Sequence, residues 1–290
     1  MDLDGRPEDT AVESREPRRV RAGRNLPVAV GVGLVLGAGV LLTLYTVKAT
    51  FLVYMAVAVG VAGWELSRAL VTRDIRIALP VLAGGSAAIW TCAYWLGTRS
   101  ALAAVALTAI AMMIWRLRGG PAGYLRDITA SVFVLAYLPL MAVFAVLMLA
   151  SSDGADRLLV FIAVTVCNDI GGYFAGILFG RHPLVPAISP KKTWEGLAGS
   201  LVVCVAVGAV LMPAVLGGRF WQGMILGAAA VGVATLGDLT ESMIKRDLEI
   251  KDMGSFLPGH GGLLDRLDSL LLNAPVAWLL LAIFVPAGAR

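Results

Sequence analysis

The sequence 237-GDLTESMIKRDLEIKDMGSFLPGHGGLLDRLDS-269 interrupts a chain that is otherwise largely apolar. This acidic segment contains seven acidic and four basic residues, and long apolar runs precede and follow it. A segment with so many charges cannot lie in the hydrocarbon of a bilayer, because each charge there costs at least about 2.5 kcal/mol. We therefore predict that the flanking runs cross a membrane and that the acidic segment lies at its surface.

The composition of the whole chain is that of a membrane protein. Of its 290 residues, 58% are hydrophobic and only 15% are charged, and the mean hydropathy is +0.81. Soluble domains are about 45–50% apolar and about 25% charged. The apolar runs approach 20 residues, which is the length of a helix that crosses about 30 Å of hydrocarbon. They also lack the alternation of barrel strands. We predict an all-α, polytopic integral membrane protein.

About nine transmembrane helices fit the apolar runs. Their predicted bounds are 27–46, 49–66, 77–97, 100–115, 128–150, 157–179, 196–216, 220–237 and 268–286. Residues 1–25 are polar and rich in arginine, and we expect a disordered basic tail. Residues 26–150 would then form an N-terminal set of membrane helices, and residues 151–290 a C-terminal catalytic region.

The basic residues predict the orientation of these helices. With nine spans, 19 of the 24 Lys and Arg residues fall on the side of the N-terminus and five on the other side. Basic residues concentrate in cytoplasmic loops, so we predict a cytoplasmic N-terminus. The two long polar loops, 180–195 and 238–267, then share the cytoplasmic face, where nucleotides and Mg²⁺ are available.

The sixth predicted span carries an amide and a carboxylate, Asn168 and Asp169. They lie about 15 Å from the cytoplasmic end of that span, at about 1.5 Å per residue. A carboxylate at this depth predicts that Asp169 faces a polar cavity or a nearby cation. The alternative is that Asp169 is a hydrogen-bonded residue in the helix packing. Glycines at every fourth position, at 172, 176 and 180, form a small-residue face suited to close helix contact.

The next loop, 180-GRHPLVPAISPKKTWEG-196, is basic and rich in proline. Ser189 could cap a helix beginning at Pro190, where the missing N–H does no harm. Such a helix start, with Lys191 and Lys192 beside it, would bind phosphate groups. Attraction of the lysine pair to anionic lipid headgroups is an equally good explanation of these residues alone.

In the acidic segment, helical spacing places oxygen ligands on one face at two separate points. Asp238, Glu241 and Ser242 follow the i, i+3, i+4 pattern, and Asp265, Asp268 and Ser269 repeat it. Carboxylate and hydroxyl oxygens are the ligands that Mg²⁺ prefers, and the two clusters could converge on such an ion. His260 lies between two glycines, and an isolated loop histidine more often makes a structural hydrogen bond than takes part in catalysis.

At this point the residues resemble a known family, the phosphatidate cytidylyltransferases. The matching positions in the acidic segment are Ser242, Lys245, Arg246, Lys251, Asp252, Gly254, Pro258, His260, Gly261, Gly262, Asp265, Arg266 and Asp268. Upstream, 189-SPKKTWEG-196 and the Asn168-Asp169 pair also match. The resemblance covers about residues 160–275, and the first five spans match only in being hydrophobic.

The resemblance implies transfer of the cytidylyl group of CTP to phosphatidic acid, with Mg²⁺ as cofactor and a second cation allowed. It implies a multi-pass cell-membrane enzyme, embedded in the lipid bilayer, that acts as a homodimer and needs no nucleic acid. The catalytic residues implied are Asp238, Asp265, Asp268, Lys245, Arg246 and His260, with the first three as metal ligands. The substrate-binding residues implied are Asp169, Ser189, Lys191, Lys192, Ser242, Lys251, Gly261, Gly262 and Arg266.

Two other functions fit parts of the sequence. A CTP-dependent lipid kinase would share the membrane setting and the nucleotide. A transporter of anionic metabolites would also place a carboxylate and a basic vestibule in the membrane, but it would not need paired carboxylates around a glycine-rich turn. No P-loop, HExxH or GxSxG motif occurs in the chain, so the commonest nucleotidase and hydrolase sites are not indicated.

Overall fold

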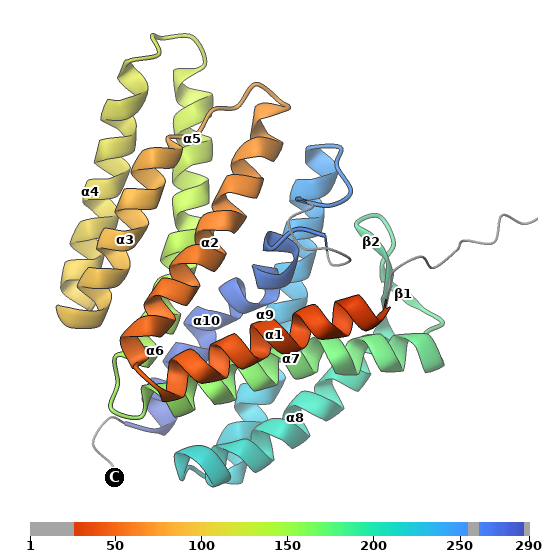
Figure 1. Ribbon diagram of the computed structural model, residues 1–290. Helices are drawn as coiled ribbons and strands as arrows, with labels where there is room; N and C mark the ends of the chain where they lie inside the picture. Colours follow the sequence, from red (N-terminus) through yellow and green to blue (C-terminus); the bar gives the residue numbers. More distant parts are fainter. Residues whose placement is uncertain (1–25, 255–260, 287–290) are drawn as a thin grey trace, which may run out of the picture.

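The chain folds into packed helices with one small hairpin (Figure 1). The computed structural model describes residues 26–254 and 261–286, and the predicted basic tail lies outside them. The helices are α1 (Leu26–Tyr45), α2 (Lys48–Val71), α3 (Leu79–Trp95), α4 (Thr98–Leu117), α5 (Tyr124–Leu135), α6 (Met141–Leu149), α7 (Gly154–Phe179), α8 (Trp194–Leu216), α9 (Phe220–Asp247) and α10 (Leu264–Phe284). A short π-helix, η1 (Ala136–Leu140), joins α5 to α6 without a break. The predicted all-α fold is confirmed.

Seven helical stretches of the described chain are long and apolar enough to cross a membrane. They are α2, α4, the continuous α5–η1–α6 stretch, α7, α8, α9 and α10. The other two predicted spans are also helical, but α3 has only 17 residues, and the apolar part of α1 with described side chains is Gly33–Tyr45. The main difference from the prediction is at the acidic segment, because α9 continues to Asp247 and α10 begins at Leu264. Both oxygen clusters are therefore helical, as predicted.

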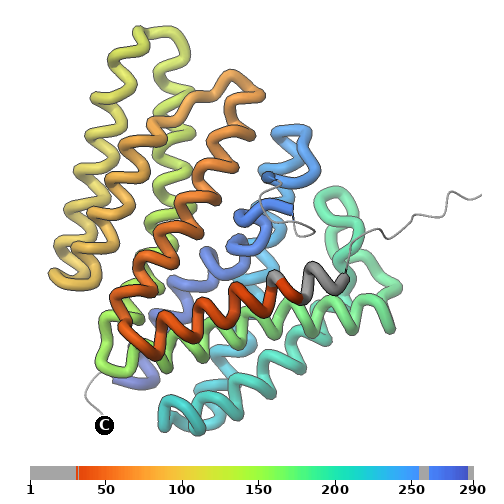
Figure 2. The backbone as a smooth tube through the Cα atoms, viewed as in Figure 1, coloured from red at the N-terminus to blue at the C-terminus, as the bar shows by residue number. Residues whose placement is uncertain are grey.

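Polar contacts join the interhelical connections into two groups. In the first group, Arg73 in the α2–α3 turn pairs with Glu249 after α9 at 2.9 Å, and Arg126 at the start of α5 donates to the carbonyl of Asp74. Arg246 at the end of α9 donates to the carbonyl of Ile188 in the hairpin at 2.6 Å. In Figure 2 these connections run across the top of the molecule, from the α4–α5 turn at the upper left to the hairpin at the right.

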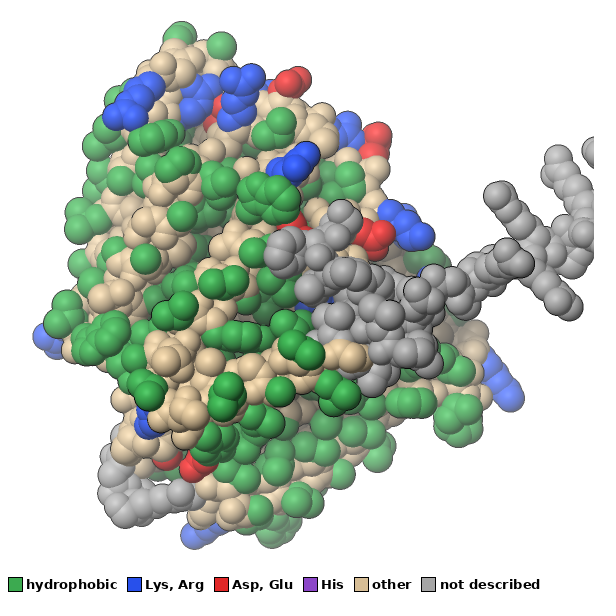
Figure 3. Space-filling view, viewed as in Figure 1, with side chains coloured by type: hydrophobic (Ala, Val, Ile, Leu, Met, Phe, Trp, Pro, Cys, Tyr) green, Lys and Arg blue, Asp and Glu red, His purple; other side chains and the backbone are tan. Residues whose placement is uncertain are grey.

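The second group of connections lies at the opposite end of the helices. Lys48 in the α1–α2 turn donates to the carbonyls of Ser151 and Ser152 before α7, and Arg157 of α7 donates to the carbonyl of Val285 after α10. Successive connections thus alternate between two faces, as a chain crossing a membrane requires. Hydrophobic side chains cover much of the flanks, and Lys and Arg side chains gather where α4 joins α5 (Figure 3).

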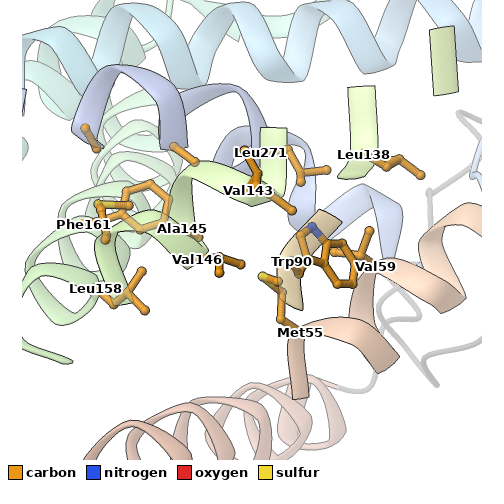
Figure 4. Packing of buried hydrophobic residues seen from close by; sticks show 14 of the residues in the cluster. Met55, Val59, Trp90, Leu138, Val143, Ala145, Val146, Leu158, Phe161 and Leu271 are labelled. Atoms are coloured by element: carbon orange, nitrogen blue, oxygen red, sulfur yellow. The ribbon is translucent and has the colours of Figure 1, made fainter. Parts of the chain in front are cut away.

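Helix α10 occupies the middle of the fold, in contact with α2, α6, α7 and α9. Its apolar side packs into a continuous core that includes Val143, Leu158, Phe161 and Leu271 (Figure 4). On its other side, α9 packs against α8, which packs against α7. Helix α10 therefore contacts both N-terminal and C-terminal helices, and its first turns carry Asp265 and Asp268.

Glycines permit the closest of these helix contacts. A Cβ atom on Gly223 of α9 would lie 1.9 Å from the carbonyl oxygen of Gly208 on α8, far inside van der Waals contact. On α7, Gly172 and Gly176 face Gly196 and Ser200 of α8. The small-residue face predicted on the sixth span is therefore a helix–helix contact surface.

The predicted helix from Pro190 is wrong. Strands β1 (Pro183–Val185) and β2 (Ser189–Thr193) form an antiparallel hairpin, and α8 begins only at Trp194. Thr193 caps α8 by accepting a hydrogen bond from the backbone N–H of Gly196 at 3.1 Å. The backbone N–H of Trp194 donates to the carbonyl of His182 at 3.0 Å. Pairing with β1 therefore keeps Ser189 and the two lysines extended, which a local capping argument could not reveal.

Candidate active site

A polar cavity of about 320 Å³ lies between the hairpin and helices α7 to α10. Its lining contains acids, cations and small residues from the two strands of the hairpin and from four helices. These residues are Asn168, Asp169, Gly172, Tyr173, Leu184, Lys191, Lys192, Thr193, Gly196, Leu197, Ser200, Thr235, Asp238, Asp265, Arg266 and Asp268. The carboxylates and the basic side chains predicted from two separate loops thus share one cavity.

Asp238 of α9 joins three elements at the centre of this cavity. Lys192 of β2 forms a hydrogen-bonded ion pair with its Oδ2 atom. The hydroxyl of Ser269 on α10 donates to its Oδ1 atom at 2.6 Å. The same hydroxyl lies 3.4 Å from Oδ1 of Asp268, which also accepts the backbone N–H of Ser269 at 2.7 Å. Two carboxylates thus share one hydroxyl group, with a lysine opposite them.

Asp265 belongs to a second network at the edge of the cavity. Its Oδ1 atom accepts from the ammonium of Lys245 at 2.8 Å, and the same ammonium donates to Glu241 at 2.7 Å. Its Oδ2 atom accepts the backbone N–H groups of Gly262 at 2.8 Å and of Met253 at 3.2 Å. Both oxygens of Asp265 are therefore engaged, which makes it the best anchored acid of the site.

On the α7 wall, the amide of Asn168 donates to Asp169 at 3.0 Å. Asn168 is buried, and its Oδ1 atom has no hydrogen-bond partner among the described residues. The hydroxyl of Ser200 on α8 donates to the backbone carbonyl of Asn168 at 2.6 Å, which ties the two helices at this depth. Asp169 is exposed to the cavity, as the intramembrane carboxylate argument predicts.

The oxygen donors of the cavity fit a hard cation, but they do not form a complete protein site. Asp169, Asp238 and Asp268 line the cavity, as does Asn168, whose amide oxygen is buried with no hydrogen-bond partner among the described residues. Within the described ranges, no group of three or more His, Cys, Asp or Glu side chains could hold a metal ion. This donor set suits Mg²⁺, which commonly binds one or two carboxylates and completes its shell with water and substrate phosphates.

The predicted site residues within the described ranges fall into three groups. Those that line the cavity are Asp169, Lys191, Lys192, Asp238, Asp265, Arg266 and Asp268. Lys245, Gly261 and Gly262 lie behind it, around Asp265. Ser189, Ser242, Arg246 and Lys251 do not line it, and the guanidinium of Arg246 instead binds the carbonyl of Ile188. His260 lies outside the described residues.

Sequence reasoning missed two polar residues that support the site. Glu65 of α2 is 2% exposed and accepts the backbone N–H of Leu264, at the start of α10. A carboxylate within an apolar run was the signal that could have identified it. Ser200 gave no such signal, because a serine in a small-residue helix is ordinary.

The chain matches known proteins over most of its length. The model of the cytidylyltransferase family matches residues 28–284, so the resemblance extends through the first five spans and is not confined to residues 160–275 as predicted. The phosphatidate cytidylyltransferase of Mycobacterium leprae is 45% identical over 282 residues, which cover 91% of this chain and 89% of the relative. That of Mycobacterium bovis is 41% identical over 278 residues, which cover 91% and 90%.

A more distant relative matches a shorter stretch. The phosphatidate cytidylyltransferase of Helicobacter pylori is 39% identical over 142 residues, which cover 49% of this chain and 53% of the relative. The family match and the two mycobacterial relatives each span most of this chain, and the family match includes the four helices and the hairpin that surround the polar cavity. The chain therefore belongs to the phosphatidate cytidylyltransferase family.

Proposed function

We propose that the polar cavity is the active site at which this chain carries out the reaction of its family. In that reaction CTP and phosphatidate give CDP-diacylglycerol and pyrophosphate. The observation that carries the proposal is the meeting of three cations, Lys191, Lys192 and Arg266, with the carboxylates of Asp169, Asp238 and Asp268 in one cavity. The cationic side chains suit the phosphates of both substrates, and the carboxylates would hold a metal ion.

The chemistry needs no protein nucleophile. A phosphate oxygen of phosphatidate attacks the α-phosphorus of CTP, and the bond from that phosphorus to the bridging oxygen of the β-phosphate breaks. Pyrophosphate leaves with the electron pair of that bond. Both reactants are anions, so catalysis consists mainly of positioning and neutralisation of charge. Lys191, Lys192 and Arg266 would neutralise phosphate oxygens, and the ion pair with Asp238 would hold the Lys192 ammonium toward the cavity.

The proposed cofactor is Mg²⁺, with Asp238 and Asp268 as its protein ligands and room for a second cation. When bound, it would neutralise charge on the phosphate oxygens. The shared Ser269 hydroxyl holds the two carboxylates side by side, and Asn168 offers a further oxygen. Asp265 is the third predicted metal ligand. Its Oδ1 atom is already bound by the ammonium of Lys245, so Asp265 would hold that lysine in place and not the metal.

The lipid substrate would enter beside α7. Tyr173 and Leu184 give the cavity wall an apolar part next to Asp169, which suits a phosphate headgroup arriving from the bilayer. We place this opening on the cytoplasmic side of the cell membrane because of the 19-to-5 distribution of basic residues. The homodimer stays a prediction, to be tested by measuring the mass of the purified protein in detergent.

The experiment supplies the purified chain in detergent with Mg²⁺, phosphatidate and CTP labelled at the α-phosphate. We expect label in the lipid product and release of equal amounts of pyrophosphate, both abolished when either substrate or the metal is omitted. A lipid kinase would move no α-label to lipid, because it transfers the γ-phosphate. A transporter would release no pyrophosphate, and either result would contradict the proposal.

A further inference from the structure

A buried carboxylate from the N-terminal half contacts the segment that connects α9 to α10. Glu65 lies near the end of α2, and its side chain does not line the polar cavity. Its Oε2 atom accepts the backbone N–H of Leu264, the first residue of α10, at 3.0 Å. A carboxylate buried to this extent costs several kcal/mol unless hydrogen bonds satisfy it. Glu65 thus supplies an acceptor to a helix start, where backbone N–H groups lack partners within the helix.

Two glycines of the connecting segment lie against the same carboxylate. A Cβ atom on Gly254 would lie 2.2 Å from the Oε1 atom of Glu65. A Cβ atom on Gly262 would lie 2.9 Å from its Oε2 atom and 2.8 Å from the Oδ2 atom of Asp265. The chain therefore approaches Glu65 closely both after it leaves α9 and before it enters α10. The carboxylate fills the space between these two points.

The backbone that Glu65 contacts is the backbone that orients Asp265. Met253 precedes Gly254, and Gly262 is the other glycine beside Glu65. The backbone N–H groups of Met253 and Gly262 both donate to Oδ2 of Asp265. Asp265 in turn holds Lys245 of α9. One turn further along α10, Asp268 faces Asp238 through Ser269. A shift of the first turn of α10 would therefore move both acids relative to α9.

We infer that Glu65 is a positioning residue for cytidylyl transfer. It fixes the start of α10 and the two ends of the connecting segment, so that Asp265 and Asp268 meet the groups of α9 at the required distances. It touches no substrate. The inference rests on the proposed function of the polar cavity, and it gives the N-terminal helices a part in the chemistry of a site whose lining comes from α7 to α10 and the hairpin.

The first arm of the test compares Glu65→Ala with Glu65→Gln in the purified full chain. We expect Glu65→Ala to lower kcat per folded molecule about 10- to 100-fold. This is the usual effect of removing a group that orients a metal-binding side chain. KM for CTP and for phosphatidate should change little, because the groups that contact substrate remain. Glu65→Gln keeps an oxygen for Leu264 and should recover most of kcat.

The second arm reads the contact without any assay of activity. Hydrogen exchange at the backbone amides of 261–269 should quicken in Glu65→Ala and stay close to normal in Glu65→Gln. The matched control is Glu249→Ala, an acid just after α9 whose side chain is 80% exposed, which should change neither kcat nor exchange in 261–269.

The third arm uses the glycine contact. Gly254→Ala alone should lower kcat, because its new methyl group meets Glu65. In the Glu65→Ala background the same change should cost much less, because the clash is gone. Equal costs in both backgrounds would overturn the inference, as would unchanged kcat per folded molecule in Glu65→Ala or unchanged exchange. If the wild-type chain made no CDP-diacylglycerol, the proposed function would be refuted. The exchange experiment would still show whether Glu65 stabilises the backbone at 261–269.

Discussion

Asp238 shows how much one side chain can organise in this protein. It is carried by α9, pairs with Lys192 of the hairpin, and accepts a hydrogen bond from Ser269 of α10. Its carboxylate thus links α9, which carries it, to the hairpin and to α10. Removal of its charge would leave Lys192 without the carboxylate that it pairs with, and Ser269 with a neutral acceptor.

We expect Asp238→Asn to lower turnover about 100- to 1,000-fold, the range found when one group that stabilises a transition state is removed. The protein should still insert and purify, because asparagine keeps the shape and can still accept from Ser269. Initial rates of pyrophosphate release measure the effect. Asp247→Asn, at an exposed acid on the same helix, is the control and should keep normal rates. A near-normal rate for Asp238→Asn would remove it from the site.

Lys245 is expected to matter for stability as well as for activity. Its ammonium lies between Glu241, which is 3% exposed, and Asp265. Lys245→Met would leave two partly or fully buried acids facing each other, which should cost about 1–3 kcal/mol. Thermal unfolding in detergent measures this loss. Adding Glu241→Gln should restore part of it by removing one charge, and a double variant no more stable than the single one would contradict the explanation.

Among the elements, the β1–β2 hairpin most clearly determines the shape of the cavity. It extends Lys191 and Lys192 beside α9 and ends at Thr193, which caps α8. The hairpin is held at its turn by the hydrogen bond from Arg246 to Ile188. The predicted helix at Pro190 would have given the two lysines a helical spacing, whereas the hairpin keeps their backbone extended and both line the cavity.

The cap of α8 can be tested by itself. Thr193→Ala removes the acceptor for the N–H of Gly196 and should lower stability by about 0.5–2 kcal/mol, whereas Thr193→Ser retains it. The midpoint of thermal unfolding in detergent compares the two variants. If serine lowered the midpoint as much as alanine, the hydroxyl would not be the stabilising group.

The contact between α8 and α9 should tolerate no methyl group at its closest point. Gly223→Ala would place Cβ 1.9 Å from the carbonyl oxygen of Gly208, so the helices must separate, at a cost of about 1–3 kcal/mol. Gly232→Ala is the matched control on α9, because a Cβ there meets nothing within 4 Å. Its expected effect is neutral or slightly stabilising. Unfolding midpoints that fall equally in both variants would mean that the close approach is unimportant.

Across the whole molecule, the alternating connections divide the protein into two polar faces. One face contains the hairpin, the α2–α3 and α4–α5 turns and the end of α9, linked by Arg73, Arg126 and Arg246. The other contains the α1–α2 and α6–α7 turns, linked by Lys48. The polar cavity opens near the first face, so the orientation of the chain decides which compartment supplies CTP.

The orientation can be measured with single cysteines in a variant that lacks Cys92, Cys167 and Cys204. A membrane-impermeant maleimide added to intact cells should label Arg99→Cys, in the exposed α3–α4 region. It should label Arg118→Cys and Arg181→Cys only after the membrane is permeabilised, because both lie on the predicted cytoplasmic face. The reverse pattern would invert the topology and move the site to the outer side.

Local spacing was enough for much of the site. The i, i+3, i+4 pattern correctly placed Asp238 and Glu241 on one helix and Asp265 and Asp268 on another, because helical periodicity depends only on neighbours in the chain. The same local reasoning failed at Ser189, where pairing with residues several positions away outweighs a capping preference. The family resemblance added Arg246 and Lys251 to the predicted site, and neither residue lines the cavity.

Hydropathy alone specified an all-α membrane protein, because a bilayer admits only segments that satisfy their own backbone hydrogen bonds and helices do so within a single run. The charged signature near the C-terminus indicated the family for a similar reason, because its residues all lie within one short stretch, 242–268. The packing of distant helices settled the rest. It brought Lys192 to Asp238 and Asp169 to the same cavity, and it brought Glu65 to the start of α10. Such contacts depend on side-chain volumes and helix crossings across the whole chain, which no single stretch of sequence contains.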